Sequence, residues 1–275
     1  MLGRLEMDVD QCITEYNELS KRIFGEPRRR FAVGWSGKIT AKFSSAKLAE
    51  EIRKVTAACP GVSPDDLFND KQEHKCRVFV CATAKETGST TRLRSYTVPG
   101  ELDVNATIVE AALATSAATT LFEPVTIGRR EFVDGALGAN NPVGEVESEA
   151  MNIWGQRNLG ASVKCFVSVG TGVAGISPVQ ESARLFFSET LVRISTETEA
   201  TATRFLDRWR AEYERNRYFR FSVQQGLQGV ALHEWEEFGL IEAATAEYLR
   251  HTEQRVRLER CISSLLDPQG TSYDH

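Results

Sequence analysis

The sequence predicts an α/β fold in which helices flank a layered, mostly parallel sheet, followed by a helical C-terminal region. Short apolar runs alternate with helix-like segments between residues 8 and 169, which is typical of a layered sheet. The run at residues 76–83 is apolar almost throughout, as expected of a strand covered on both faces. The chain becomes charged and helix-like after residue 178. We therefore expect residues 1–178 to form one part and residues 179–275 a mainly helical extension packed on it.

Two helices are expected first, at residues 8–24 and 45–57, because apolar residues recur every three to four positions in both segments. Strands and helices are then expected to alternate: strands at 76–83 and 92–98, a small-residue helix from 108, a strand at 132–134, a helix at 142–154 and a strand at 163–169. The extension is expected to contain helical residues 179–215, a strand at 218–223 and further helix from 235 to 266.

Composition limits the possible partners and cofactors. The 275 residues carry a formal net charge of −5, which argues against a nucleic-acid partner held by bulk electrostatics. The six cysteines show no Cys-x-x-Cys and no paired Cys/His spacing, so we expect no metal site and no cofactor. Cys76, Cys81 and Cys165 lie in apolar runs and are expected to be buried free thiols, as in a reducing compartment.

These features predict a cytoplasmic protein. No secretory leader pattern is visible. No apolar run approaches the ~18 residues of a membrane span, so any membrane contact is expected to be peripheral. The basic run Arg28–Arg30 is interpreted as a solvated loop, with contact to anionic lipid headgroups as the alternative.

The segment with the most chemical information is residues 132–142, in which a short apolar strand ends on Asp134. A carboxylate that acts as a general base needs a fixed position beside the hydroxyl that it deprotonates, and the end of a buried strand supplies it. Gly135 lets the backbone turn where a Cβ would clash. Ala136 keeps the approach to the carboxylate narrow but open.

The residues after this turn support the same interpretation. Asn140 and Asn141 suit a loop that is fastened by side-chain hydrogen bonds, and Pro142 fits the first turn of a helix. The alternative is that Asp134 and Gly135 form only a turn, because Asp-Gly is a common turn dipeptide.

Two neighbouring segments strengthen the functional interpretation. Residues 108–124 form an Ala/Ser-rich stretch that ends in Glu-Pro, and residues 163–172 form an apolar strand followed by Ser-Val-Gly-Thr-Gly. Together with the Asp-Gly-Ala motif, these segments resemble patatin-like acyl hydrolases in order and spacing, over roughly residues 1–175. The resemblance implies that Asp134 is the acidic half of a Ser–Asp dyad, that no cofactor takes part, and that the substrate is a phospholipid or another acyl lipid.

The resemblance stops at the nucleophile. No Gly-x-Ser-x-Gly occurs in the sequence, and Gly34-Trp35-Ser36-Gly37 lacks the second spacer residue. Residues 1–5 look like the end of the family's nucleophile-elbow helix, so residues 1–178 are expected to be the later portion of a patatin-like domain. None of the four histidines lies in a triad-like context.

Three explanations stay open: a fragment of a longer protein, a truncated gene product, and a degenerate non-catalytic homologue. The first two predict a lipid acyl hydrolase of phospholipase A2 or lysophospholipase type, inactive as printed. The third predicts a non-catalytic lipid-binding or regulatory module. A nucleotide-binding α/β domain that uses residues 170–172 is a further alternative, although the sequence lacks a complete phosphate-binding motif.

Overall fold

A computed structural model describes residues 1–26, 41–155, 159–173 and 185–266. The basic run at 28–30 and the serine at position 36 lie outside these residues. The chain divides into two compact units, one formed by residues 1–140 and 232–236, and the other by residues 141–231 and 237–275. Contacts between residues define these two units. The predicted domain boundary at residue 178 stays a prediction.

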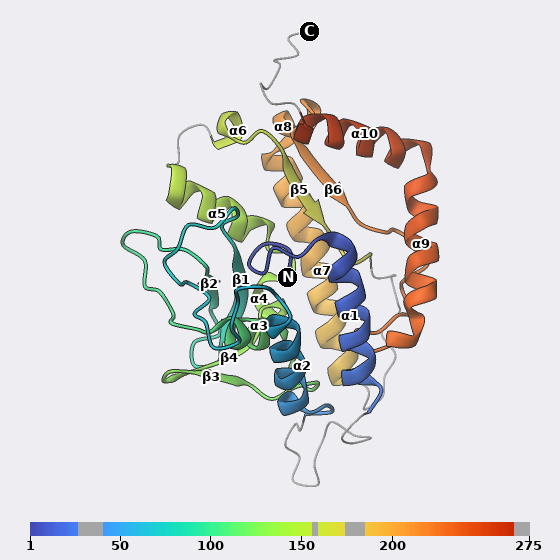
Figure 1. Cartoon of the computed structure of the whole chain (residues 1–275). Helices are drawn as coiled ribbons and strands as arrows, with labels where there is room; N and C mark the ends of the chain where they lie inside the picture. Colours follow the sequence, from blue (N-terminus) through green and yellow to red (C-terminus); the bar gives the residue numbers. More distant parts are fainter. Residues whose placement is uncertain (27–40, 156–158, 174–184, 267–275) are drawn as a thin grey trace. The chain divides into compact units, whose positions relative to one another are not determined.

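Six of the eight helices and strands described in the first unit lie close to positions that the sequence predicts, whereas β3 and α4 were not predicted (Figure 1). Its helices are α1 (Val9–Phe24), α2 (Ser45–Ala57), α3 (Ile108–Ser116) and α4 (Ala136–Ala139), and its strands are β1 (Phe79–Ala84), β2 (Thr90–Arg94), β3 (Val125–Ile127) and β4 (Arg130–Asp134). Capping residues fix where the helices begin: Asp8 and Thr107 each form a capping box, which satisfies backbone N–H groups that have no partner within the helix. Residues 1–5 form turns and no helix.

The sheet of this unit is antiparallel throughout, so the prediction of a mostly parallel sheet is wrong here. Its strand order is β2-β1-β4-β3, and each neighbouring pair is antiparallel. Two of the connections are hairpins, formed by residues 85–89 and by Gly128 with Arg129. Connections this short cannot return a chain to the start of a parallel strand. Gly128 has φ +62°, and two-residue hairpin turns favour a residue with positive φ at their first position.

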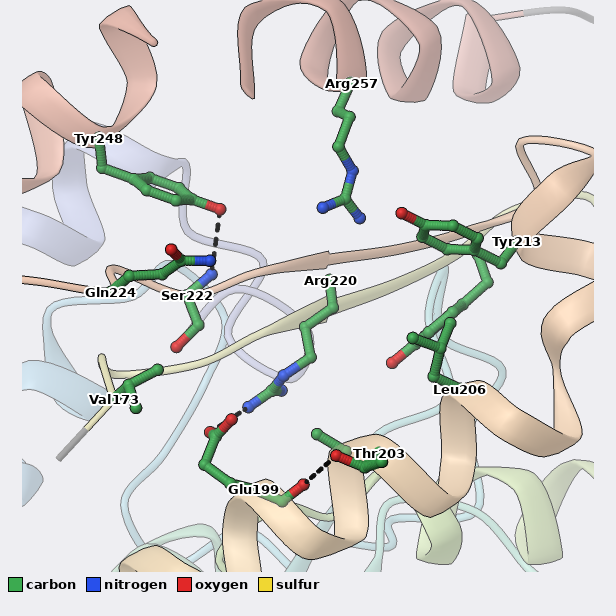
Figure 2. Close-up of a pocket in the computed structure, with 12 residues that line it drawn as sticks. Val173, Glu199, Thr203, Leu206, Tyr213, Arg220, Ser222, Gln224, Tyr248 and Arg257 are labelled. Atoms are coloured by element: carbon green, nitrogen blue, oxygen red, sulfur yellow. Dashed lines mark hydrogen bonds and ion pairs between the residues drawn. The ribbon is translucent and has the colours of Figure 1, made fainter. Parts of the chain in front are cut away.

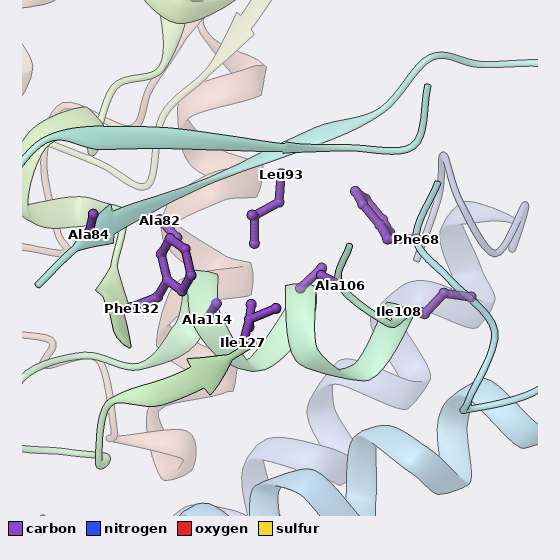
Figure 3. Close-up of a cluster of buried hydrophobic side chains, with 10 residues drawn as sticks. Phe68, Ala82, Ala84, Leu93, Ala106, Ile108, Ala114, Ile127 and Phe132 are labelled. Atoms are coloured by element: carbon purple, nitrogen blue, oxygen red, sulfur yellow. The ribbon is translucent and has the colours of Figure 1, made fainter. Parts of the chain in front are cut away.

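One face of this sheet packs against α3 (Figure 3). Phe132 is 0% exposed, and Figure 3 shows it with Leu93 and Ile127 among the side chains that fill the space between strands and helix. Alanines on the facing helix allow the close approach expected of a small-residue helix. The buried members of this cluster are Phe68, Ala82, Ala84, Leu93, Ala106, Ile108, Ala111, Ala114, Ile127 and Phe132.

The second unit is mainly helical and has a separate two-stranded sheet. Its elements are α5 (Val143–Trp154), α6 (Leu159–Ser162), β5 (Phe166–Val169), α7 (Leu185–Arg208), α8 (Arg210–Glu214), β6 (Tyr218–Phe221), α9 (Phe238–Arg250) and α10 (Thr252–Leu266), with the short 3-10 helix η1 (Trp235–Glu237) before α9. β5 and β6 are parallel, and helices α7 and α8 between them supply the long crossover that a parallel pair needs. The sequence predicts a single layered sheet that contains both the strand at 163–169 and the strand that ends on Asp134, and this prediction is wrong because β5 pairs with β6 in a separate sheet.

An aromatic cluster forms the core of the second unit. Phe205 stacks on Trp209 with ring centroids 5.3 Å apart, and Phe166 and Tyr218 lie against the same pair. Aromatic side chains bury large areas and dominate core energetics. The cluster therefore holds α7, β5 and β6 together.

The predicted burial of the cysteines holds for only part of the set. Cys81 is buried within β1, and Cys165 is half-buried. Cys76 is exposed, which contradicts the prediction, because β1 begins three residues later at Phe79 and leaves Cys76 in the preceding loop.

We expect Phe132→Ala to lower the free energy of unfolding by about 3–5 kcal/mol, the range for truncating a fully buried aromatic side chain. Urea unfolding followed by circular dichroism measures the loss. Leu102→Ala is the matched control because Leu102 is 94% exposed, and it should change the free energy of unfolding by less than ~0.5 kcal/mol. Equal effects of the two substitutions would contradict this core.

Candidate functional site

Asp134 is the last residue of β4, as the sequence predicts. Its backbone N–H donates to the carbonyl of Ala117 at 3.1 Å, and its own carbonyl accepts from the hydroxyl of Thr83 at 3.1 Å. In the sheet Asp134 lies opposite Ala82 of β1. The backbone that carries the carboxylate is therefore held from a neighbouring strand and from the segment that follows α3.

Gly135 turns the chain away from the sheet immediately after this carboxylate. A Cβ at this position would overlap the backbone carbonyl oxygen of Cys81, because β4 and β1 approach closely there. The backbone of Gly135 has ordinary helical dihedral angles, so only the close approach requires glycine. The next residues form α4, in which the N–H of Ala139 donates to the carbonyl of Gly135 at 2.7 Å.

The Asp134 carboxylate has one hydrogen bond in the described part of the chain. Oδ1 accepts from the backbone N–H of Ala136 at 2.9 Å, so Ala136 supports the site through its backbone. Burial raises the pKa of Asp134, and the hydrogen bond from Ala136 opposes this increase. A carboxylate with a raised pKa is a better general base near neutral pH.

No serine, threonine or cysteine side chain within the described residues hydrogen-bonds this carboxylate. The hydroxyl of Thr83 bonds the backbone carbonyl of Asp134 instead. The hydroxyl of Thr115 donates to the carbonyl of Cys81 at 2.7 Å. Among the described residues, the structure therefore positions a candidate base but brings no nucleophile to it.

The two asparagines of the motif lie at the junction of the two units. Asn140 is exposed at the end of the first unit. Asn141 begins the second, where its Oδ1 accepts from the N–H of Val143 at 3.3 Å and its Nδ2 donates to the carbonyl of Thr198 at 3.3 Å. Asn141 thus links the start of α5 to α7 through its side chain.

The Gly170-Thr171-Gly172 segment follows β5 in the second unit. Gly172 has φ +110°, a backbone conformation that residues with a Cβ rarely adopt. The N–H of Gly170 donates to the carbonyl of Phe221 at 2.8 Å, which extends the parallel pairing of β5 with β6. This segment and Asp134 belong to different units, and the structure does not relate them.

Within the described ranges, no group of three or more His, Cys, Asp or Glu side chains is arranged to hold a metal ion. None of the helices in that part of the chain combines the length and the apolar composition needed to cross a bilayer.

Comparison with models of protein families assigns the chain to one family. The model of the patatin-like phospholipases matches residues 2–146, which is more than half of the sequence and includes Asp134. The chain belongs to the patatin-like phospholipase family. A comparison with curated proteins found none that matches. Membership associates this patatin-like chain with lipid acyl hydrolysis at the level of the family, and the match ends before residues 163–172, the third segment of the predicted resemblance.

The supporting contacts of Asp134 in this patatin-like chain were not predicted individually. Thr83 and Ala117 hold the backbone of Asp134. Ala117 lies in the Ala/Ser-rich stretch at residues 108–124, whereas Thr83 belongs to no recognisable motif. The small-residue composition of α3 was the available signal, because it indicates a helix that approaches the sheet closely enough for such contacts.

We expect the free energy of unfolding of Asp134→Asn, measured relative to that of the parent protein, to increase as pH rises from about 4 to 7. The raised pKa means that the folded state holds the proton more tightly than the unfolded state does. The contribution of the group to stability is therefore complete below the unfolded pKa near ~3.9 and is lost as pH rises through the folded pKa. Urea unfolding at several pH values measures the difference.

Asp70→Asn is the matched control with the opposite sign. Burial acts to raise the pKa of Asp70, but hydrogen bonds from Gln72 and His74 and the charge of Arg4 lower it overall. Its contribution to stability is present above the unfolded pKa and is lost as pH falls. Asp70→Asn should therefore destabilise more at pH 7 than at pH 4. The same slope for both variants would contradict the assignment of these pKa shifts.

A second prediction concerns the close approach of Gly135. Gly135→Ala should lower the free energy of unfolding by about 1–3 kcal/mol, because its Cβ would meet backbone that cannot rotate away. Gly144→Ala is the control: Gly144 lies within α5 with open space around it, so the alanine should stabilise by up to ~1 kcal/mol. Unchanged stability in Gly135→Ala would contradict the close approach.

Proposed function

We propose that this chain carries the acidic half of a patatin-like lipid acyl hydrolase, with Asp134 as the general base of a Ser–Asp dyad. The observation that carries the proposal is a carboxylate fixed at a strand end, with its pKa raised by burial, within the segment that matches the family. In such a dyad the base takes the serine proton as the hydroxyl attacks the acyl carbonyl.

The proposed substrates are carboxylic esters of phospholipids or other acyl lipids, in the manner of phospholipase A2 and lysophospholipase reactions. The proposed setting is the cytoplasm, with peripheral contact to the lipid surface where the substrate lies. Gly135 and Ala136 would shape the approach to the carboxylate, and Asn140 and Asn141 would stabilise the loop that follows. No metal or cofactor takes part in this chemistry.

The polypeptide of 275 residues is proposed to be inactive by itself. Acyl transfer needs a nucleophile, a base and hydrogen-bond donors for the oxyanion. The sequence has no Gly-x-Ser-x-Gly, and none of the hydroxyl or thiol groups of the described residues hydrogen-bonds the Asp134 carboxylate. When such groups act as a unit, losing the nucleophile removes almost the whole effect.

The same observation supports a second candidate, a non-catalytic lipid-binding or regulatory module that retains the scaffold. In that case the position of Asp134 would be structural. A rebuilt nucleophile separates the two candidates, because only a true base would then support turnover.

We expect the printed chain to hydrolyse short-chain nitrophenyl esters no faster than its Asp134→Ala variant. Without the nucleophile, Asp134 has no proton to accept. Spectrophotometric release of nitrophenol measures the rates, and labelling with a fluorophosphonate probe checks for a reactive serine. An Asp134-dependent rate that the probe abolishes would reveal a nucleophile in the chain.

In a chimera that adds the N-terminal strands, Gly-rich loop and serine elbow of a close relative, we expect esterase activity that depends on Asp134. Asp134→Asn keeps the shape but removes the base, so it should lower kcat by roughly 10²–10⁴-fold. Glu131→Gln is the matched control, since Glu131 lies on the same strand and its carboxylate pairs with Lys85 at the surface. A folded chimera in which Asp134→Asn keeps full activity would favour the non-catalytic module.

A further inference from the structure

A cavity of about 240 Å³ lies within the second unit, between α7, β6, α9 and α10 (Figure 2). Nine of its twelve lining residues have polar or charged side chains, including two arginines, three tyrosines and one carboxylate: Val173, Glu199, Ala202, Thr203, Leu206, Tyr213, Tyr218, Arg220, Ser222, Gln224, Tyr248 and Arg257. This cavity is smaller than the ~300–1,000 Å³ of drug-sized ligand sites. It therefore suits a small polar group and not an acyl chain.

Arg257 supplies a positive charge that no carboxylate offsets within the described ranges. Its guanidinium lies over the rings of Tyr213 and Phe221, with distances of 5.4 and 5.8 Å to the ring centroids. These contacts orient the guanidinium through its faces, and none of its N–H groups has a hydrogen-bond acceptor among the described residues. A planar guanidinium held in this way presents its N–H groups for bidentate binding of an oxyanion.

Arg220 is the second cation, and its charge is partly offset. Nη2 pairs with Glu199 at 3.4 Å, and Nη1 donates to the hydroxyl of Ser168 at 3.0 Å. Figure 2 shows the Arg220 side chain extending toward Glu199 below Arg257. With Glu199 counted, the two arginines leave the lining with a charge of +1, which favours an anionic ligand.

Two buried hydroxyl groups in the lining have no hydrogen-bond partner among the described residues, namely Tyr218 Oη and Ser222 Oγ. Tyr218 is only 2% exposed. The neighbouring Ser168 hydroxyl accepts instead from Arg220 Nη1 at 3.0 Å. A buried hydroxyl without a partner is costly, and an anion that accepts from it would remove that cost.

Gly170 keeps space open beside these groups. A Cβ at this position would lie 2.7 Å from Ser222 Oγ and 3.1 Å from Arg220 Nη2. The glycine segment after β5, which the acyl-hydrolase proposal does not use, therefore adjoins the cavity wall.

The number of donors favours one class of anion. Two arginines and two hydroxyls can donate hydrogen bonds into the cavity, a carboxylate has only two oxygens to accept them, and a phosphate monoester has three terminal oxygens.

We propose that this cavity is a binding site for a phosphate monoester, with Arg257 as its main anchor and Arg220, Tyr218 and Ser222 as further donors. Free phosphate compounds and the phosphate of a lipid headgroup share this chemistry. The site lies wholly in the second unit and does not depend on catalysis at Asp134.

Calorimetric titration of the full chain with inorganic phosphate and with glycerol 3-phosphate, at constant ionic strength, tests the site. We expect saturable binding with one site per chain. Arg257→Gln should weaken it roughly 10- to 100-fold, as expected for loss of charged hydrogen bonds. Arg260→Gln is the matched control, because Arg260 is exposed on the same helix and does not line the cavity, and it should change affinity by no more than about twofold.

Ser222→Ala tests the site without changing its charge. It should weaken binding by roughly 2- to 10-fold through loss of one hydrogen bond. Circular dichroism and thermal unfolding check that each variant folds, so a folding failure in Arg257→Gln leaves Ser222→Ala to decide.

Vesicle flotation distinguishes the two sources of phosphate. Binding to phosphatidylcholine vesicles that contain phosphatidic acid, lost in Arg257→Gln but not in Arg260→Gln, would assign the site to a lipid headgroup. Binding of the soluble compounds alone would assign it to a free phosphate monoester. No saturable binding of any probe up to ~20 mM, or equal affinities of the folded parent, Arg257→Gln and Ser222→Ala proteins, would overturn the proposal.

Discussion

The position of the candidate base depends on one backbone group, the carbonyl of Cys81. This oxygen accepts a hydrogen bond from Thr115 at the end of α3, and Gly135 packs directly against it. Helix α3, strand β1 and the turn after β4 therefore meet at a single carbonyl. Because interiors are densely packed, a displacement of any of these elements would move Asp134. The carboxylate is placed by this packing together with the backbone hydrogen bonds of Asp134 to Thr83 and Ala117.

The local environment of Asp134 combines stable backbone contacts with an unfavourable setting for its charge. Burial disfavours the carboxylate anion, and within the described residues a single N–H group opposes that effect. A purely structural aspartate at a turn would gain more from full solvation or from further donors. A buried carboxylate with a raised pKa at the end of a strand is typical of a functional position.

The sequence predicted the kinds of element well and their arrangement poorly. Apolar periodicity identified α1 and α2 nearly to the residue, because the hydrophobic face of a helix depends on residues that are three or four positions apart in the sequence. Strand direction is not local, and a continuous apolar run fits either type of sheet. The turn at Gly128 and Arg129 carried the missing information, since a hairpin there forces β3 and β4 to be antiparallel. Asp134 was found because the end of its strand and the following Gly-Ala are adjacent in sequence, whereas its supports at Thr83 and Ala117 come from distant segments.

The family match and the polar cavity describe different parts of the chain. The match ends at residue 146, whereas the cavity residues lie between positions 173 and 257. The family match therefore includes Asp134 but does not extend to Arg257 or to the buried hydroxyls of Tyr218 and Ser222. Packing alone does not explain the two hydroxyls, since an apolar wall would avoid buried hydroxyls without a partner. A ligand that accepts hydrogen bonds would satisfy them, and the positive charge of Arg257 in the same lining favours an anion.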